Sequence, residues 1–396
     1  MRIPTADELQ RDTVYTFADQ LEACLDRVLT HCTGLPAPHP AFVLFFSVSD
    51  GRRRAHVLHA RAATLEDAWR DGAARAAAWA AQNAPGRAWL RVDWVDAVDT
   101  VGWKAFNDGL AQVKRNYFRG GIALDDAFDV AFLEQEINAN AMLYGGAQVS
   151  HAVVNAHNFA VYSQARFGTA LRPDLAPDRR VHLFTTGAVF CGEDGVVHDI
   201  AGRGFDAGRR VVERLDQHAV HALVDSGARF LARQVQPGGR FVYGYFPCFD
   251  RPIPTYNTLR HASSTYALVE AWELTGGDAL RQAIETSLAY LAGSLIRHYT
   301  LPDGRRAAFL VDTGEEIKLG GNAVCLLAFV KYSEVTGSRD WLPLLEELAT
   351  GIAWLQDPAT GRLTHVLNAG DLSVKEPFRI IYYDGEAAFG SCASTA

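Results

Sequence analysis

The sequence has no excess of positive charge. Its 396 residues carry 46 Asp and Glu against 38 Lys and Arg, for a formal net charge of −8. A general nucleic-acid-binding protein would show a basic patch or stripe, so the balance argues against that class. The one basic run, Arg52–Arg54, directly follows Asp50 and Gly51, which predicts the solvated tip of a β-hairpin and not a phosphate site.

Long apolar runs are missing as well. No stretch approaches the roughly 18 apolar residues that a membrane-spanning helix needs. Residues 1–17 also lack the apolar region of a signal peptide. The sequence therefore predicts a protein without a membrane span, and we expect it in the cytoplasm.

Cysteine is sparse, and no two cysteines form a C-x-x-C pair. This spacing argues against a disulfide framework or a zinc ligand set, and it predicts buried thiols in a reducing compartment. The scattered glycine pairs make neither a P-loop nor a dinucleotide fingerprint. The sequence thus predicts no metal and no cofactor. The six cysteines are at positions 24, 32, 191, 248, 325 and 392.

Residues 1–210 predict an α+β domain, whose role the sequence leaves open. An amphipathic pattern predicts a helix within residues 1–35, and an Asp-Gly turn between apolar runs predicts two paired strands over 41–63. Thr64–Asp67 then forms a capping pattern before an Ala-rich helix. Alternation of apolar and polar residues over 87–98 predicts a half-buried strand.

Residues 125–129, Asp-Asp-Ala-Phe-Asp, resemble the Asp-Asp-x-x-Asp motif that binds magnesium diphosphate in class I terpene synthases. That chemistry needs oxygen ligands on one helix face and a second metal motif on a facing helix. Residues 107–115 begin like such a second motif but lack its Ser/Thr and its final Glu. We therefore interpret 125–129 as the acidic N-terminus of a helix, which suits the helix dipole.

The C-terminal part of the sequence repeats itself. Residues 262–275 and 323–336 both run from Ala to Thr, and each is followed by a glycine that predicts a left-handed helix stop. The pattern predicts a second helix after each, over about 279–298 and about 340–356. A third copy begins near Tyr382.

Each second helix, and the helix before the first copy, leads to a glycine turn and a short extended piece. The glycines are at 239, 304 and 361, spaced by 65 and 57 residues. Two helices in a repeat of this length indicate helical hairpins that bury their faces against their neighbours. Closed into a ring, such hairpins form an α/α toroid; left open, they form a solenoid.

The helix ends at 230–245 and, more loosely, at 352–366 resemble the Gln…Gly-x-Phe helix ends of terpenoid-cyclase and protein-prenyltransferase toroids. The same hairpin plan occurs in toroidal glycoside hydrolases, polysaccharide lyases and glucuronyl epimerases. The resemblance implies that residues 211–396 form an all-α, incomplete α/α toroid. Only about three hairpins are present, so we expect either a chain truncated at its C-terminus or an open half-ring that dimerises.

Each repeat has a long polar and aromatic loop before its inner helix, over 241–261, 309–322 and 366–386. Equivalent loops converge at the mouth of a toroid, so the three are expected to form one cleft. The candidate catalytic residues are Asp312, Glu316, Asp384, Glu386 and His261. The candidate substrate-binding residues are Tyr243, Tyr245, Asp250, Arg251, Tyr256, Asn257, Arg260, Lys318, Arg379, Tyr382 and Tyr383.

These residue types suit a saccharide. Tyr offers a flat face to a sugar ring, and Arg binds carboxylates in a bidentate way. Two facing carboxylates would serve glycoside hydrolysis, and a Tyr or His beside an Arg-bound uronate would serve a lyase or an epimerase. Ordinary structural roles stay open beside these: His261 and Asn322 as helix caps, Asp303 and Asp384 as turn residues, and Glu315 and Glu316 as a solvated face.

The leading hypothesis is a carbohydrate-active enzyme of hydrolase, lyase or epimerase type, acting on a saccharide or a uronate-containing polymer. The alternative is a non-catalytic toroid that binds a glycan or a protein in polysaccharide assembly. An isoprenoid cyclase is the second alternative, although the charged loops argue against it. The oligomeric state stays open.

Overall fold

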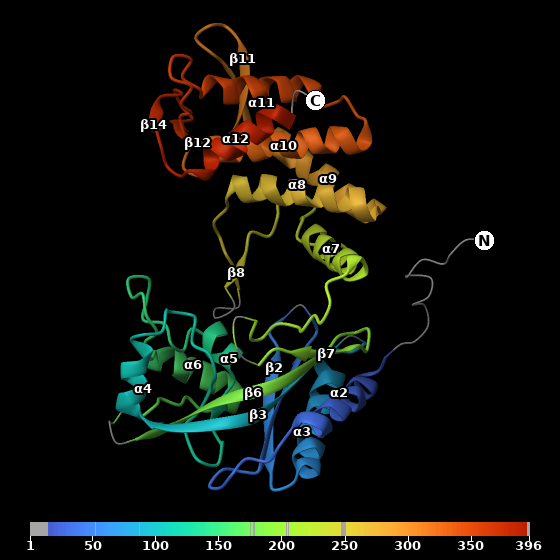
Figure 1. The fold of residues 1–396 in the computed structure, drawn as a ribbon, viewed down its shortest axis with the longest axis vertical. Coiled ribbons are helices and arrows are strands. Elements are labelled where there is room, and N and C mark those ends of the chain that lie inside the picture. Colours follow the sequence, from blue (N-terminus) through green and yellow to red (C-terminus); the bar gives the residue numbers. More distant parts are fainter. Residues whose placement is uncertain are drawn as a thin grey trace, which may run out of the picture. The chain divides into compact units, whose positions relative to one another are not determined.

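The computed structural model describes residues 15–393, apart from residues 52, 87, 175, 177, 178, 203, 205 and 247–250. The described residues form two compact units, and the chain passes from the first to the second between Glu213 and Arg214 (Figure 1). The sequence places the corresponding boundary after residue 210. Asp250, a predicted site residue, lies outside the described residues.

An antiparallel seven-stranded sheet organises the first unit, in the order β2-β1-β3-β6-β4-β5 with β7 paired to β6. Strands β3 and β6 pair from Leu90 opposite Cys191 to Gly102 opposite Arg180, with an irregularity between Val95 and Ala97 (Figure 1). The elements are α2 (Phe17–His31), β1 (Phe42–Ser49), β2 (His56–Ala62), α3 (Leu65–Asn83), β3 (Trp89–Gly102), α4 (Trp103–Leu110), β4 (Gly121–Ala123), β5 (Ala131–Phe132), α5 (Glu134–Ala139), α6 (Ala156–Phe167), β6 (Arg180–Cys191) and β7 (Val197–Ile200).

Helix α3 packs closely on strand β1. Its predicted cap is confirmed, because Thr64 Oγ1 accepts a hydrogen bond from the Asp67 N–H at 3.2 Å. A Cβ on Gly72 would lie 2.1 Å from the Phe46 ring, so only glycine allows this approach. The predicted pair of strands over 41–63 is likewise confirmed as β1 and β2.

The interpretation of residues 125–129 as a helix N-terminus is wrong. The segment is the turn between β4 and β5, and the helix begins later, at Glu134. The Asp125 carboxylate accepts hydrogen bonds from the N–H groups of Asp129 and Val130, both at 2.8 Å. A short acidic side chain can close a turn on itself in this way instead of capping a helix.

The second unit contains the predicted helix pairs, but it is not all-α as expected. Its strands β10–β14 form a five-stranded sheet in chain order (Figure 1). The elements are α7 (Gln217–Ala232), β8 (Tyr245–Phe246), β9 (Arg251–Pro252), α8 (Thr258–Thr275), α9 (Asp278–Tyr290) with the π-helical turn η2 (Leu291–Leu295), β10 (Ile296–Thr300), β11 (Arg306–Asp312), β12 (Glu316–Lys318), α10 (Leu319–Thr336), α11 (Leu342–Trp354), β13 (Val366–Asn368), β14 (Val374–Glu376) and α12 (Tyr382–Ala393).

A glycine ends each of the two repeated helices. Gly337 follows α10 in the predicted left-handed conformation, with φ 70° and ψ 6°. Gly276 follows α8 with φ 69° but ψ −161°, which lies outside the left-handed helical region. The N–H of Gly276 donates to the Trp272 carbonyl, and that of Gly337 to the Ser333 carbonyl, each satisfying an orphan carbonyl of the last turn. Short connections then lead into α9 and α11.

Cys24, Cys32, Cys191 and Cys325 are free thiols. Cys24, Cys191 and Cys325 are buried, as the sequence predicts, whereas Cys392 is exposed. Within the described ranges, the helices lack the combination of length and apolarity that crossing a membrane requires.

Candidate functional site

Helices α8 and α10 lie side by side and point the same way. Near their starts, a Cβ on Gly321 would lie 3.7 Å from the Cβ of Leu259. Near their ends, Lys331 Nζ contacts Glu273 at 2.8 Å. Because both helices advance in step, their N-termini lie at the same end of the unit.

Helix α12 packs against α10 and runs in the same direction. A Cβ on Gly320 would lie 2.2 Å from Glu386 Oε2 and 2.4 Å from the Tyr383 ring, and one on Gly390 would lie 3.1 Å from the Ala323 carbonyl. The N-termini of α8, α10 and α12 therefore gather together. The dipoles of the three helices give this end a partial positive charge that favours anions.

A cavity of about 380 Å³ opens along the first loop. Aromatic walls surround it, with Tyr243 and Tyr256 at a ring-centroid distance of 6.0 Å. The Arg240 guanidinium stacks over the Tyr256 ring at 4.3 Å. We call this space the tyrosine cavity; its lining residues are Phe230, Leu231, Gln234, Phe241, Val242, Tyr243, Gly244, Tyr245, Tyr256, Asn257, Arg260, His261 and Ser264.

Hydrogen bonds running into the core fix the inner wall of the tyrosine cavity. The Phe241 N–H donates to the Tyr256 hydroxyl at 3.1 Å, and that hydroxyl lies 2.6 Å from His261 Nδ1. His261 Nε2 lies 3.1 Å from the Ser287 carbonyl, which can only accept. Nε2 therefore carries the proton, Nδ1 accepts from Tyr256, and burial lowers the pKa of His261 to about 4.

Asn257, and not His261, caps helix α8. Its Oδ1 accepts from the Arg260 N–H at 2.9 Å, while His261 lies one turn inside the helix and is 1% exposed. Asn322 is also no cap, because it sits inside α10 and bonds both the N–H and the carbonyl of Leu310. Both capping interpretations from the sequence are wrong.

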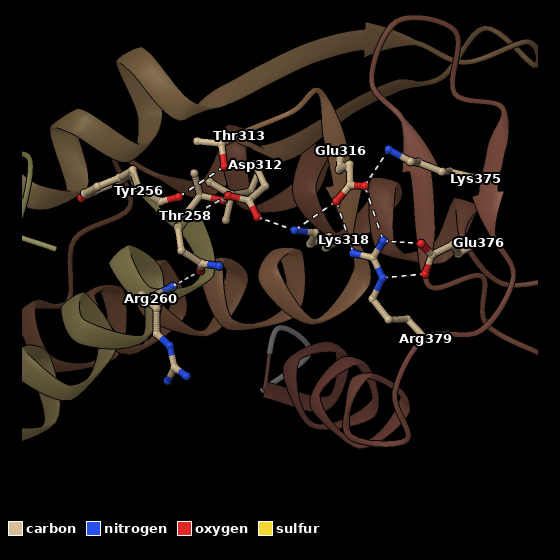
Figure 2. Close-up of polar contacts among 12 residues, drawn as sticks. Tyr256, Thr258, Arg260, Asp312, Thr313, Glu316, Lys318, Lys375, Glu376 and Arg379 are labelled. Carbon is tan, nitrogen blue, oxygen red and sulfur yellow. Dashed lines mark hydrogen bonds and ion pairs between the residues drawn. The ribbon is translucent and has the colours of Figure 1, made fainter. Parts of the chain in front are cut away.

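The Arg260 side chain brings a positive charge to the tyrosine cavity. Its side chain is exposed, and its guanidinium makes no hydrogen bond or ion pair with another described residue (Figure 2). Arg379, by contrast, is held by the carboxylates of Glu316 and Glu376. Arg260 is therefore available to an anionic ligand.

The second and third loops meet in a network of charges (Figure 2). Lys318 Nζ contacts Asp312 at 2.6 Å and Glu316 at 3.1 Å. Glu316 also contacts Lys375 at 2.6 Å and Arg379 at 3.2 Å. Arg379, followed by Lys375, lowers the pKa of Glu316 to about 2, so this carboxylate stays ionised.

The first loop is tied to the second through Asp312. The N–H of Thr258 donates to Asp312 Oδ1 at 3.1 Å, and the Thr313 hydroxyl donates to the Tyr256 carbonyl at 3.3 Å. The second predicted loop thus contacts both the first and the third, at the end where the helix N-termini gather (Figure 2).

The carboxylates of helix α12 differ from this network. Asp384 pairs with His365 Nε2 at 3.2 Å. Glu386 Oε2 is buried without a hydrogen-bond partner among the described residues, and burial raises the pKa of this carboxyl. Beside them, Tyr383 packs its ring 5.4 Å from that of His365, while Tyr382 is 68% exposed.

The structure therefore sorts the predicted residues into three groups. Six of them line the tyrosine cavity, namely Tyr243, Tyr245, Tyr256, Asn257, Arg260 and His261. Four join the charge network or border it, namely Asp312, Glu316, Lys318 and Arg379. Asp384, Glu386, Tyr382 and Tyr383 lie on α12, and Arg251 lies on β9. Sequence reasoning missed Gly320, whose signal is a Gly-Gly pair inside the first turn of a helix.

No protein-family model matches this chain, and no curated protein matches it. Among solved structures, cellobiose 2-epimerase from Bacillus thermoamylovorans is similar at 12% identity over 46% of this chain and 48% of that one, with a TM-score of 0.36. A D-mannose isomerase is similar at 12% identity over 45% and 49%, with a TM-score of 0.34. A family 76 glycoside hydrolase from a bovine Bacteroides thetaiotaomicron strain is similar at 8% identity over 77% and 70%, with a TM-score of 0.29. The match spans about half the length of the epimerase and the isomerase.

Proposed function

We propose that the second unit is a carbohydrate-active enzyme that binds an acidic saccharide in the tyrosine cavity. The observation that carries this proposal is the exposed Arg260 guanidinium, which has no described partner, at a cavity walled by three tyrosines. Tyrosine rings give flat amphipathic faces with a polar end. A guanidinium forms a bidentate pair with a uronate carboxylate, and the gathered helix N-termini add to the attraction.

Within this proposal, the exposed Tyr243 and Tyr245 contact sugar rings, while Arg260 and Asn257 bind polar groups. Arg251 and Tyr382 are proposed as further contacts. The charge network around Asp312 and Glu316 positions the loops, because each carboxylate already accepts several hydrogen bonds from its neighbours. His261 fixes Tyr256 through its hydrogen bond.

Glu386 is the proposed proton donor. A carboxyl group with a raised pKa keeps its proton nearer neutral pH, which hydrolases, lyases and epimerases all use in general acid catalysis. Its buried Oε2 has no hydrogen-bond partner among the described residues, in contrast to the paired Asp312 and Glu316. Glu386 lies beside Gly320 at the start of α10 and outside the lining of the tyrosine cavity, so the proposal requires a substrate that extends from this cavity to α12.

A non-catalytic glycan-binding unit is the second candidate. One observation favours it: the residues lining the tyrosine cavity include aromatic rings, amides and Arg260, but no described carboxylate. A binder needs affinity without proton transfer, which this lining provides.

To test the proposal, the full chain is titrated with an oligouronate and with a neutral oligosaccharide of equal length to measure binding. Product formation from each saccharide is followed by NMR. Arg260→Met should weaken oligouronate binding by about tenfold or more, since charged hydrogen bonds contribute about 1.5–3 kcal/mol. Neutral oligosaccharide binding should change little, and Arg281→Met on α9 is the matched control. Glu386→Gln should remove turnover and preserve binding.

Oligouronate binding without turnover would select the glycan-binding unit. Equal binding by wild type and Arg260→Met, or no saccharide binding at all, would overturn the proposed site.

A further inference from the structure

Two histidines and an aspartate meet in the first unit, and none of them belongs to the residues that the sequence singles out as a site. His39 precedes strand β1, Asp126 lies in the turn between β4 and β5, and His182 lies on β6. One ligand atom from each lies within 4.8 Å of the other two. His182 Nε2 is 3.3 Å from Asp126 Oδ1, and the two imidazole centroids are 5.1 Å apart. Three chain segments thus bring three metal-binding groups to one point.

Hydrogen bonds orient both imidazoles toward that point. His182 Nδ1 lies 2.8 Å from Thr100 Oγ1, which can accept its proton. His39 Nδ1 lies 3.1 Å from the backbone carbonyl of Asp126, to which it can only donate. Metal-bound histidines usually donate their second nitrogen in this way, and the partner fixes the ring and its tautomer. Each histidine therefore keeps Nε2 for a ligand bond.

The turn that carries Asp126 is braced on both sides. The Asp125 carboxylate accepts two backbone N–H bonds from residues 129–130, both at 2.8 Å. The Phe128 carbonyl accepts a hydrogen bond from His59 Nε2 at 2.8 Å. A braced turn holds a carboxylate in place before a metal arrives, which lowers the entropy lost on binding.

The surroundings suit an ion that keeps one water ligand. The His182 side chain is 3% exposed and that of Asp126 is 61% exposed, so the cluster opens to solvent on one side.

We propose that His39, Asp126 and His182 bind a divalent transition-metal ion, preferentially Zn²⁺, with a fourth position open to water. Two imidazoles and a carboxylate match the nitrogen and oxygen ligands of zinc. Magnesium and calcium prefer oxygen ligands throughout, so they fit this set less well. The sequence predicts no metal here because the three ligands come from segments separated by more than fifty residues.

The test uses the full chain after treatment with a chelator. Zn²⁺ binding is measured by calorimetry, and Co²⁺ is added as a probe whose visible absorption reports a tetrahedral site. We expect one ion per chain. His39→Ala and Asp126→Asn should each weaken Zn²⁺ binding by about 100-fold, and Thr100→Val by about tenfold through the loss of its hydrogen bond.

Two matched controls accompany these variants. Asp129→Asn changes a neighbouring aspartate that pairs with Arg61, and His157→Ala removes a histidine on α6; neither should alter Zn²⁺ affinity. Circular dichroism and thermal unfolding verify that each variant folds. Binding that is unchanged in folded His39→Ala and Asp126→Asn, or fewer than one ion per chain at saturation, would overturn the site.

Discussion

The Tyr256 hydroxyl donates to His261 Nδ1 at 2.6 Å, and the His261 Nε2–H donates to the Ser287 carbonyl at 3.1 Å. This chain leaves the imidazole neutral in one tautomer and fixes the ring that forms a wall of the tyrosine cavity. The shape of the candidate site therefore depends on a buried hydrogen bond between Tyr256 and His261.

The neutral state of His261 predicts a stability that depends on pH. Burial lowers its pKa from 6.5 to about 4 in the folded chain, so the unfolded chain binds the extra proton first. Stability is fully present above pH 6.5 and declines as the pH falls towards 4, by about 3 kcal/mol. Thermal unfolding of the second unit between pH 7 and 4 measures this. His261→Gln should flatten that dependence, and an unchanged slope would contradict the assignment.

Removal of the Tyr256 hydroxyl should destabilise the second unit. Tyr256→Phe leaves His261 Nδ1 without a donor and the Phe241 N–H without an acceptor, at a cost of about 1–3 kcal/mol. Tyr243→Phe is the control: this residue is 40% exposed, and the change should stay within about 0.5 kcal/mol. Chemical denaturation compares the two, and equal losses would show that the hydrogen bond is unimportant.

Glu316 should contribute more to the stability of the second unit than Glu376 does. Glu316→Gln removes the charge shared by Lys318, Lys375 and Arg379, and we expect a loss of about 2 kcal/mol at pH 7. Because the folded pKa is about 2 against an ordinary 4.5, this contribution is present above pH 4.5 and is lost as the pH falls towards 2.

Glu376→Gln provides the comparison for that measurement. Glu376 contacts Arg379 and is 39% exposed, so its loss should be smaller. Denaturation of both variants at pH 7 and pH 3 tests the ranking. A larger effect at Glu376 would contradict the role assigned to the network.

Adjacent glycines in α10 should respond oppositely to alanine. Gly320→Ala places a Cβ 2.2 Å from Glu386 Oε2, which should push α12 away and cost about 1–3 kcal/mol. Gly321→Ala meets its nearest atom at 3.7 Å and should be neutral or stabilising by up to about 1 kcal/mol, through higher helix propensity. Thermal unfolding and limited proteolysis near residue 382 distinguish them. If both variants are equally stable, the close approach of α12 is unsupported.

Local sequence patterns were sufficient to predict those features that depend on interactions between residues a few positions apart. The Thr64 cap and the stops at Gly276 and Gly337 each follow from a side chain or a backbone angle within one helical turn. These features need no information from distant parts of the chain.

Other features depend on partners that lie far away in the sequence. Strand β12 pairs Glu316 with Asn368, and such a sheet partner leaves no local signal. His261 and Asn322 resemble caps by position, but their hydrogen bonds go to Ser287 and to Leu310 across the core. The roles of these side chains are set by packing, which a one-dimensional pattern cannot supply.

The paired strands β3 and β6 have a mechanical consequence for the first unit. Their ladder extends from Leu90 and Cys191, in the apolar cluster with helix α3, to Val181, in the cluster with helix α4. Because this two-stranded ribbon takes part in both apolar clusters, we expect that neither cluster can open without breaking hydrogen bonds of the β3–β6 ladder. Ion binding at His182, which lies on β6, would therefore slow amide exchange as far away as the α3 side of the sheet.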